Sequence, residues 1–233
     1  MGQKVNPIGF RTGITEGWAS RWYAPKAAYG EFLIEDQKIR RFIDGEINHP
    51  PPPAPSAQIA RVEIERTRNE VTVFIHTARP GMVIGSRGAD VEKLQESLEE
   101  LIDRKVDIKV IEIKQPDLSA QLVAESIAEQ LKKRASFRRT MKQHCEATMQ
   151  AGAKGVKIIC SGRLGGSEMA RSERQTMGSI PLQTLQANVD YGYAVSHTTY
   201  GAIGVRVWIY TGMYGEEVKE PTGDRQPARR GKR

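Results

Sequence analysis

Cysteine and histidine are scarce in this 233-residue chain, which limits the chemistry that it can support. The two cysteines, Cys145 and Cys160, form no CxxC pair, and the four histidines are scattered at positions 49, 76, 144 and 197. Neither pattern fits a disulfide framework or a structural zinc site. We therefore expect two buried free thiols in a reducing cytosol, with no metal and no cofactor.

Long apolar runs are also absent. No window approaches the ~20 apolar residues that a membrane-spanning helix needs. The N-terminus, MGQKVNPIGFRTG, lacks the apolar core of a secretory signal. Acidic residues are outnumbered, since 35 Lys and Arg against 28 Asp and Glu give a net charge of +7 and a pI near 9.4. This excess favours a polyanionic partner, and without membrane signals nucleic acid is the better candidate.

The first half of the chain predicts an arm followed by one small domain. Residues 1–28 have no periodic pattern. The arm's aromatic residues can stack on bases or anchor it on a protein surface, and the sequence favours neither. Over 29–115 the patterns predict a helix, two strands joined by a hairpin, a short helix, a glycine loop, a helix and a strand. The string HPPPPAPSA interrupts this domain at 49–57 and predicts an extended proline-rich insertion.

The second half predicts two helices followed by strands. Pro116 and Asp117 break the chain, and we expect a second domain over 116–211. One helix is capped by Asp117 or Ser119, and a second is capped by Ser136 and ends near Gly152. The strands are expected around 156–160, 169–175, 185–191 and 203–209. The tail, 212–233, is predicted to be basic and disordered, because five of its last nine residues are Arg or Lys.

The stretch VIGSRGADVEKL carries two glycines three residues apart, Gly85 and Gly88. It matches neither the P-loop pattern GxxxxGK[ST] nor the dinucleotide pattern GxGxxG. A GxxG loop between helices lets its amides approach phosphates while aliphatic flanks hold unstacked bases, as in KH domains. Four residues alone would favour a plain turn between helices, but the order of elements resembles the type II KH arrangement. Ser86 is short and uncharged, so we expect Arg87 to supply the loop's charge.

Six cations fall within eleven residues near the junction of the two helices of the second half. They are Lys132, Lys133, Arg134, Arg138, Arg139 and Lys142. On a helix, Arg138 and Arg139 neighbour Lys142 at i, i+4 and i, i+3. A solvated helix face normally mixes both signs of charge, whereas no acidic residue lies between Lys132 and Lys142. The patch therefore favours RNA.

Several longer strings extend these observations. They are MGQKVNPIGFR, IHTARPGMVIGSRGADVEKL, RASFRRTMKQ, GAKGVKIICSGRLGGSEMAR and HTTYGAIGVRVWIY. In this order they resemble the bacterial ribosomal protein family that is third in the small-subunit series. The resemblance covers nearly all of residues 1–211. The resemblance implies an α+β fold: an N-terminal type II KH domain, then a C-terminal domain of two helices packed on a mostly antiparallel sheet. It also implies a cytoplasmic, ribosome-bound constituent of the subunit head.

The same resemblance assigns roles to particular residues. Arg138, Arg139 and Lys142 match positions that line the channel where messenger RNA enters and that assist its unwinding without nucleotide hydrolysis. The RNA-binding KH loop would be Gly85, Ser86, Arg87 and Gly88. Further candidates for binding small-subunit rRNA are Lys4, Arg11, Arg163, Arg171, Arg229 and Arg230. The implied protein neighbours are the tenth and fourteenth small-subunit proteins.

Two other interpretations are weaker. A free-standing KH regulator would more often repeat KH units, but GAKG at 152–155 and GRLG at 162–165 lack the flanking helices of a KH loop. An enzyme would need acids and histidines at a useful spacing, and none recurs. We therefore expect an RNA-binding ribosomal protein and not an enzyme.

Overall fold

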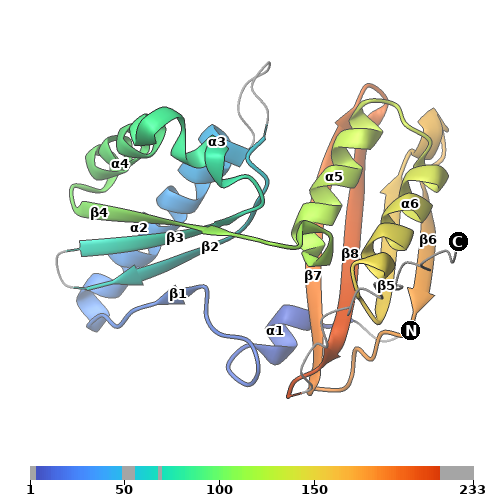
Figure 1. Ribbon diagram of the computed structural model, residues 1–233, viewed down its shortest axis with the longest axis horizontal. Helices are drawn as coiled ribbons and strands as arrows, with labels where there is room; N and C mark the ends of the chain where they lie inside the picture. The colour runs from blue at the N-terminus through green and yellow to red at the C-terminus, as the bar shows by residue number, and fades with distance from the viewer. Residues whose placement is uncertain (1–3, 49–55, 68–69, 216–233) are drawn as a thin grey trace, which may run out of the picture.

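The computed structural model describes residues 4–48, 56–67 and 70–215. Two α+β bodies lie side by side, and an extended segment runs from β4 to α5 between them (Figure 1). The N-terminal half contains α1 (Pro7–Arg11), β1 (Ser20–Arg21), α2 (Lys26–Ile43), β2 (Ile59–Arg66), β3 (Glu70–Thr77), α3 (Pro80–Ile84), α4 (Ala89–Ile102) and β4 (Lys105–Glu112). The C-terminal half contains α5 (Ala120–Lys132), α6 (Phe137–Gln150), β5 (Gly155–Gly162), β6 (Arg171–Gly178), β7 (Ala187–Thr198) and β8 (Gly201–Met213).

The N-terminal half builds one sheet in the order β1-β2-β3-β4. β2 and β3 pair antiparallel, and β4 runs parallel to β3. Leu94, Leu98 and Ile102 recur every fourth residue on α4 and are buried in one core with Ile39 and Ile43 of α2. From α2 to β4 the elements follow the predicted order.

The N-terminal arm is more regular than predicted. Asn6 accepts a hydrogen bond from the Ile8 backbone N–H (3.0 Å), and Pro7 opens the short helix α1. β1 pairs with β2 over two residues only, too few to leave a periodic pattern. α2 starts at Lys26 rather than residue 29 and continues as a π-helical turn over Asp44–Asn48. Most of the predicted proline-rich insertion, residues 49–55, lies outside the described residues.

The C-terminal half is a sheet in the order β6-β5-β8-β7, and every pairing in it is antiparallel. α5 and α6 cover one face of this sheet (Figure 1). Between the layers lies a core that shares no residue with the core of the N-terminal half. The predicted α+β class and its helix-on-antiparallel-sheet architecture are confirmed. The limits placed at residues 29 and 116 stay predictions.

Strand bounds in this half differ from those predicted. β6 and β7 both start two residues later than expected and extend further, and β8 runs through Met213. Residues 212 and 213, assigned to the tail, therefore pair with Asn188 and Ala187 of β7, and that assignment was wrong. Residues 216–233 lie outside the described part of the chain. The strands were misplaced because their uncovered side carries Arg, Tyr and His, which hides the apolar alternation.

The cap of α5 was also misplaced. Neither Asp117 nor Ser119 caps the helix: Ser119 is at the N-cap but makes no side-chain cap bond. Instead the Asp190 carboxylate, reaching across from β7, accepts a hydrogen bond from the Ala120 N–H at 2.7 Å. A residue 70 positions away caps the helix, a pairing that local sequence does not predict.

Candidate RNA-binding surfaces

The glycine loop sits between α3 and α4, as predicted, in a conformation that needs its glycines. Gly85 has φ 70° and ψ −171°, a region that is essentially restricted to glycine. Gly88 has φ 86°, and Arg87 between them is also left-handed at φ 57°. Ser86 and Arg87 are exposed at the tip. The loop therefore presents its backbone and one guanidinium to solvent.

An acidic residue that the sequence analysis overlooked lies against this loop. A Cβ built on Gly85 would fall 2.0 Å from the Asp90 carboxylate oxygen, so the carboxylate occupies the space left by the missing side chain. Asp90 is in the first turn of α4, where the helix dipole favours a negative charge. Its other neighbour is Lys93, 3.9 Å away. The carboxylate occupies the start of α4, where a phosphate would also be favoured, so Arg87 is the exposed positive charge of the loop.

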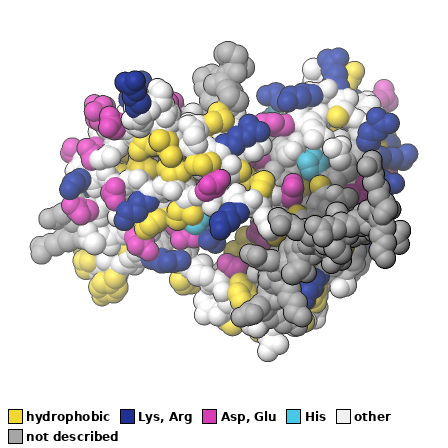
Figure 2. All heavy atoms as spheres, viewed as in Figure 1, with side chains coloured by type: hydrophobic (Ala, Val, Ile, Leu, Met, Phe, Trp, Pro, Cys, Tyr) yellow, Lys and Arg dark blue, Asp and Glu magenta, His cyan; other side chains and the backbone are white. Residues whose placement is uncertain are grey.

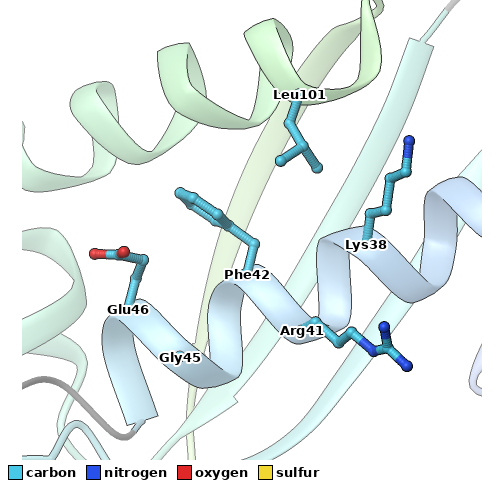
Figure 3. A pocket seen from close by; sticks show the side chains of 6 residues that line it. All are labelled: Lys38, Arg41, Phe42, Gly45, Glu46 and Leu101. Carbon is cyan, nitrogen blue, oxygen red and sulfur yellow. The ribbon is translucent and has the colours of Figure 1, made fainter.

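Two hollows lie between α2 and α4. One of about 390 Å³ is lined by Lys38, Arg41, Phe42, Gly45, Glu46 and Leu101 (Figure 3). In that view Leu101 points from α4 towards α2, while Arg41 points away from α4. The second, about 370 Å³, is also lined by Val83 of α3 and Asp90 of α4, which flank the glycine loop. Val83 is itself buried, whereas Ile84 beside it is 40% exposed, so Ile84 is the aliphatic flank that is free to meet a base.

The predicted basic patch forms at the turn between α5 and α6, and all six of its cations are exposed. Backbone bonds from Arg134 to Leu131 and from Ala135 to Gln130 end α5, and Arg134 adopts φ 61°. This tight turn brings Lys132, Lys133 and Arg134 next to the first turn of α6. Lys and Arg side chains gather where these helices meet (Figure 2). We call this set of six the α5–α6 patch.

The patch is unfavourable for the helix that carries it. The first turn of α6 holds Arg138 and Arg139 and no acidic residue. Cations near a helix N-terminus oppose its dipole, each by about 0.3–1 kcal/mol. A local arrangement that costs stability is typical of a functional surface.

Only part of the patch is neutralised within the described residues. Glu173 on β6 lies 3.5 Å from Arg138, and Glu146 lies 3.8 Å from Lys142. For Arg139 there is no ion pair with any residue that the structure describes. Glu173 also lies 3.7 Å from Arg171, and both arginines stack near the ring of Phe137. Arg171 thus extends the patch onto β6, which spacing along the sequence could not show.

Arg11 was wrongly predicted to bind rRNA, because its side chain is fully buried. Its guanidinium donates to the carbonyls of Ala187 (2.8 Å), Thr184 (2.8 Å), Leu182 (3.2 Å), Pro181 (3.4 Å) and Pro7 (3.2 Å). All three guanidinium nitrogens therefore donate to the protein's own backbone. Arg11 is therefore a structural residue that fixes α1 to the C-terminal half.

The remaining rRNA candidates differ in how available they are. Lys4 is exposed. Arg163 is half-buried and donates to the carbonyls of Ser167 (3.0 Å) and Tyr200 (2.9 Å), so it ties two loops together. Arg229 and Arg230 lie outside the described residues.

The arm aromatics divide between the two roles left open. Trp22 donates to the Asp36 carboxylate at 2.8 Å and packs near Tyr29 and Phe32, so it anchors the arm on α2. Trp18 and Tyr23 are 66% and 93% exposed, and they stay available for a partner.

The described residues hold no group of three or more His, Cys, Asp or Glu side chains that could bind a metal ion. Both cysteines are free and buried, as expected. Burial raises the pKa of Cys145 to about 11 and that of Cys160 to about 12, so neither is a reactive thiolate at neutral pH. Among the described helices none is both long and apolar enough to span a bilayer.

A KH-type glycine loop and a dense basic patch on a two-domain α+β fold define an RNA-binding protein. Comparison with known proteins makes this specific. The family model for the KH domain matches residues 38–118, and the model for the C-terminal domain of ribosomal protein S3 matches residues 127–209.

Curated relatives cover nearly the whole chain. The chain is 56% identical to small ribosomal subunit protein uS3 of Rhodopirellula baltica, over 93% of this chain and 91% of that protein. It is 51% identical to uS3 of Desulforamulus reducens (95% and 97%) and 55% identical to uS3 of Finegoldia magna (91% and 84%). The chain belongs to the uS3 family of small ribosomal subunit proteins.

Family membership confirms several predictions together. The chain is a structural, RNA-binding ribosomal protein of the cytoplasm and not an enzyme. Membership of the uS3 family favours a ribosomal protein over a free-standing KH regulator.

Proposed function

We propose that the chain is a constituent of the small-subunit head, where it binds small-subunit rRNA and guides messenger RNA into the subunit. The α5–α6 patch supports this proposal most directly. Its exposed cations lie on one turn and one helix face, where they can hold several successive phosphates of a strand. The KH loop is a second contact, through Arg87 and the loop amides.

The patch would assist unwinding passively. Arg138, Arg139 and Lys142 hold the phosphates of a separated strand, and ribosomal translocation supplies the movement. No nucleotide needs to be hydrolysed by this chain. In the subunit head we propose the tenth and fourteenth small-subunit proteins as its neighbours. Within the chain we propose a domain boundary near residue 116.

The test is translation through a hairpin. Ribosomes carrying Arg138→Ala, Arg139→Ala and Lys142→Ala together should elongate more slowly through a stable hairpin, but at the normal rate on an unstructured messenger. A matched control removes three exposed cations elsewhere, Arg21, Lys105 and Lys109, each of which lies in an ion pair with an exposed carboxylate. Equal slowing on both templates, or equal slowing by the control, would contradict the proposed role.

A further inference from the structure

The C-terminal sheet has a second face, opposite α5 and α6. On the helix side, residues such as Ile158, Val205 and Val207 are fully buried. The register places three rows of side chains on the other side, each crossing all four strands. The rows are Thr176, Lys157, Trp208, Tyr191; then Arg174, Ile159, Arg206, Tyr193; then Ser172, Ser161, Gly204, Val195. We call these twelve positions the open face.

The open face carries charge of one sign. Lys157, Arg174 and Arg206 are its charged residues, and none of the twelve positions is Asp or Glu. Within the described residues none of the three has an ion-pair partner. Burial, then the positive charges of Lys4 and Arg174, lower the pKa of Lys157, so a fourth cation lies close to the face. Concentrated, unpaired positive charge on a folded sheet is suited to phosphates.

Aromatic rings alternate with these cations. The Lys157 ammonium lies 5.0 Å from the centre of the Trp208 ring, and Trp208 lies 5.3 Å from Tyr191. In the next row Tyr193 is 48% exposed. Its ring lies over Gly204, where an added Cβ would come within 3.6 Å of it. The missing side chain at Gly204 keeps this part of the face flat.

One end of the face is closed and the rest is open. Val189 and Tyr210 continue the outward rows beyond Tyr191 and Trp208, but they are buried against Ile180 and Leu182. Arg11 holds that segment in place through the carbonyls of residues 181–184. Arg174, Tyr193, Val195 and Arg206 remain exposed beyond this cover. The platform is therefore built and fixed before any partner arrives.

We propose that the open face binds an unpaired segment of RNA, with a base stacked on the exposed ring of Tyr193, next to the partly buried Trp208, and its phosphates held by Lys157, Arg174 and Arg206. The inference rests on the proposed RNA-binding function and adds a site to it. Strands lie about 4.8 Å apart and alternate residues about 6.6 Å apart, so ring and cation recur at spacings that suit successive nucleotides. The exposed ring of Tyr193 suits an unstacked base better than a duplex, which offers only its edges and backbone. An acidic protein would match the charge but would not require a flat aromatic platform.

The binding test uses the full chain and a fluorescein-labelled 12-nucleotide oligouridylate. The face variant is Lys157→Gln, Arg174→Gln and Arg206→Gln combined. The comparison variant removes the same charge from the α5–α6 patch, which is itself proposed to bind RNA, by Arg138→Gln, Arg139→Gln and Lys142→Gln. We expect the face variant to bind at least tenfold more weakly. A plot of the logarithm of the association constant against the logarithm of the salt concentration should become less steep by roughly 2. The reason is that three phosphate contacts are lost and each releases about 0.7 counterion on a single strand. Circular dichroism of each variant confirms that it is folded.

The position of the RNA is tested separately. Trp208 is one of three tryptophans, so Trp18→Phe and Trp22→Phe make it the sole reporter. The RNA should quench its fluorescence, and the quenching should persist with the α5–α6 patch neutralised but vanish with the face neutralised. Because Trp22 anchors the arm, ultraviolet cross-linking of the unmodified chain in assembled small subunits gives a second measurement. Nucleotide adducts on peptides carrying Tyr193 or Trp208 are expected.

Three results would overturn the inference. They are affinity loss confined to the patch variant, quenching that survives in the face variant, and cross-links from the face to a neighbouring protein alone. None of these results affects the outcome of the hairpin experiment, because that experiment tests the α5–α6 patch. The proposed function and this inference can therefore fail independently.

Discussion

At the scale of single residues, Arg11 shows how a surface-type side chain becomes part of the core. Its guanidinium joins α1, the segment at 181–184 and the first residue of β7. A buried charge is tolerated only when its hydrogen-bonding groups are satisfied. Here backbone carbonyls satisfy it, and within the described part of the chain it donates to no carboxylate.

Replacing Arg11 with lysine should destabilise the C-terminal half although the charge is kept. A lysine has three donors on one nitrogen and cannot reach five carbonyls in different directions. Leaving several buried carbonyls unpaired should cost about 2–5 kcal/mol. Native-state hydrogen exchange of β7 amides measures this as a lower free energy of opening.

Arg171→Lys is the matched control for this measurement, because Arg171 is exposed and lies in a surface ion pair. Its cost should stay within about 0.5 kcal/mol. Equal protection in Arg11→Lys and the unmodified protein would show that the fan of hydrogen bonds contributes nothing.

Arg11 also marks where sequence analysis stops. Ala187, to which it donates, is 176 positions away, and no local pattern distinguishes this arginine from its exposed neighbours. The α5–α6 patch was predictable because its six cations are close in sequence and a helix keeps them on adjoining faces. Glu173 and Arg171 lie beside the patch but belong to β6, and the sequence did not connect them with the patch. Charged residues that are close in sequence can be recognised as a cluster from the sequence. Contacts between residues that are far apart in sequence can be recognised only once the fold is known.

At the scale of elements, α3, the glycine loop and α4 form one unit whose shape depends on two different glycines. Gly85 is confined by its backbone angles and by the Asp90 carboxylate. Gly88 has a left-handed backbone at φ 86° and ψ 0°, but open space where a side chain would go. A side chain at Gly85 would meet both backbone strain and a steric clash, whereas one at Gly88 would meet backbone strain alone. Comparing substitutions at the two positions therefore separates the two effects.

Gly85→Ala should destabilise this unit by about 2–4 kcal/mol, from strain and from collision with Asp90. Gly88→Ala, the control, should cost about 1–2 kcal/mol from strain alone. Hydrogen exchange of the α4 amides measures both. Adding Asp90→Ala to Gly85→Ala should recover the part of the collision due to the carboxylate but not all of it, because the Cβ of residue 90 stays 2.7 Å from the added Cβ. No recovery would mean that the carboxylate is not what excludes a side chain.

The same element scale explains which strands were predicted well. β3 alternates apolar and polar residues, and it was predicted as the second strand of the hairpin. β7 was predicted less well, because its uncovered side presents Tyr191, Tyr193 and His197 while its covered side includes Gly192 and Ser196. Gly192 is required there, since a Cβ would fall 2.2 Å from the Ala120 carbonyl. The close approach of α5 thus removed the apolar signal by which the strand would have been recognised.

At the scale of the whole molecule, the N-terminal arm connects the two halves a second time. Trp22 is anchored on α2 of the KH domain, and α1 is bound to the C-terminal half through Arg11. Figure 1 shows α1 beside the lower end of β7, away from the segment that joins β4 to α5. These two connections, together with the hydrogen bond that Asn48 donates to the Glu125 carboxylate of α5 (3.2 Å), limit how freely the KH loop can move relative to the α5–α6 patch.

The α5–α6 patch and the open face lie on opposite sides of one sheet, with the core of the C-terminal half between them. Charges on one side contact no residue of the other, so their contributions to binding a long RNA should be independent. With a 40-nucleotide unstructured RNA, which is long enough to reach both, the losses of binding free energy in the two triple-glutamine variants should add. The six-substitution variant should match that sum within about 0.5 kcal/mol, and its salt slope should fall by roughly 4. Fluorescence anisotropy over a salt series measures both quantities. A combined variant no weaker than the worse of the two would mean that a single surface binds the RNA.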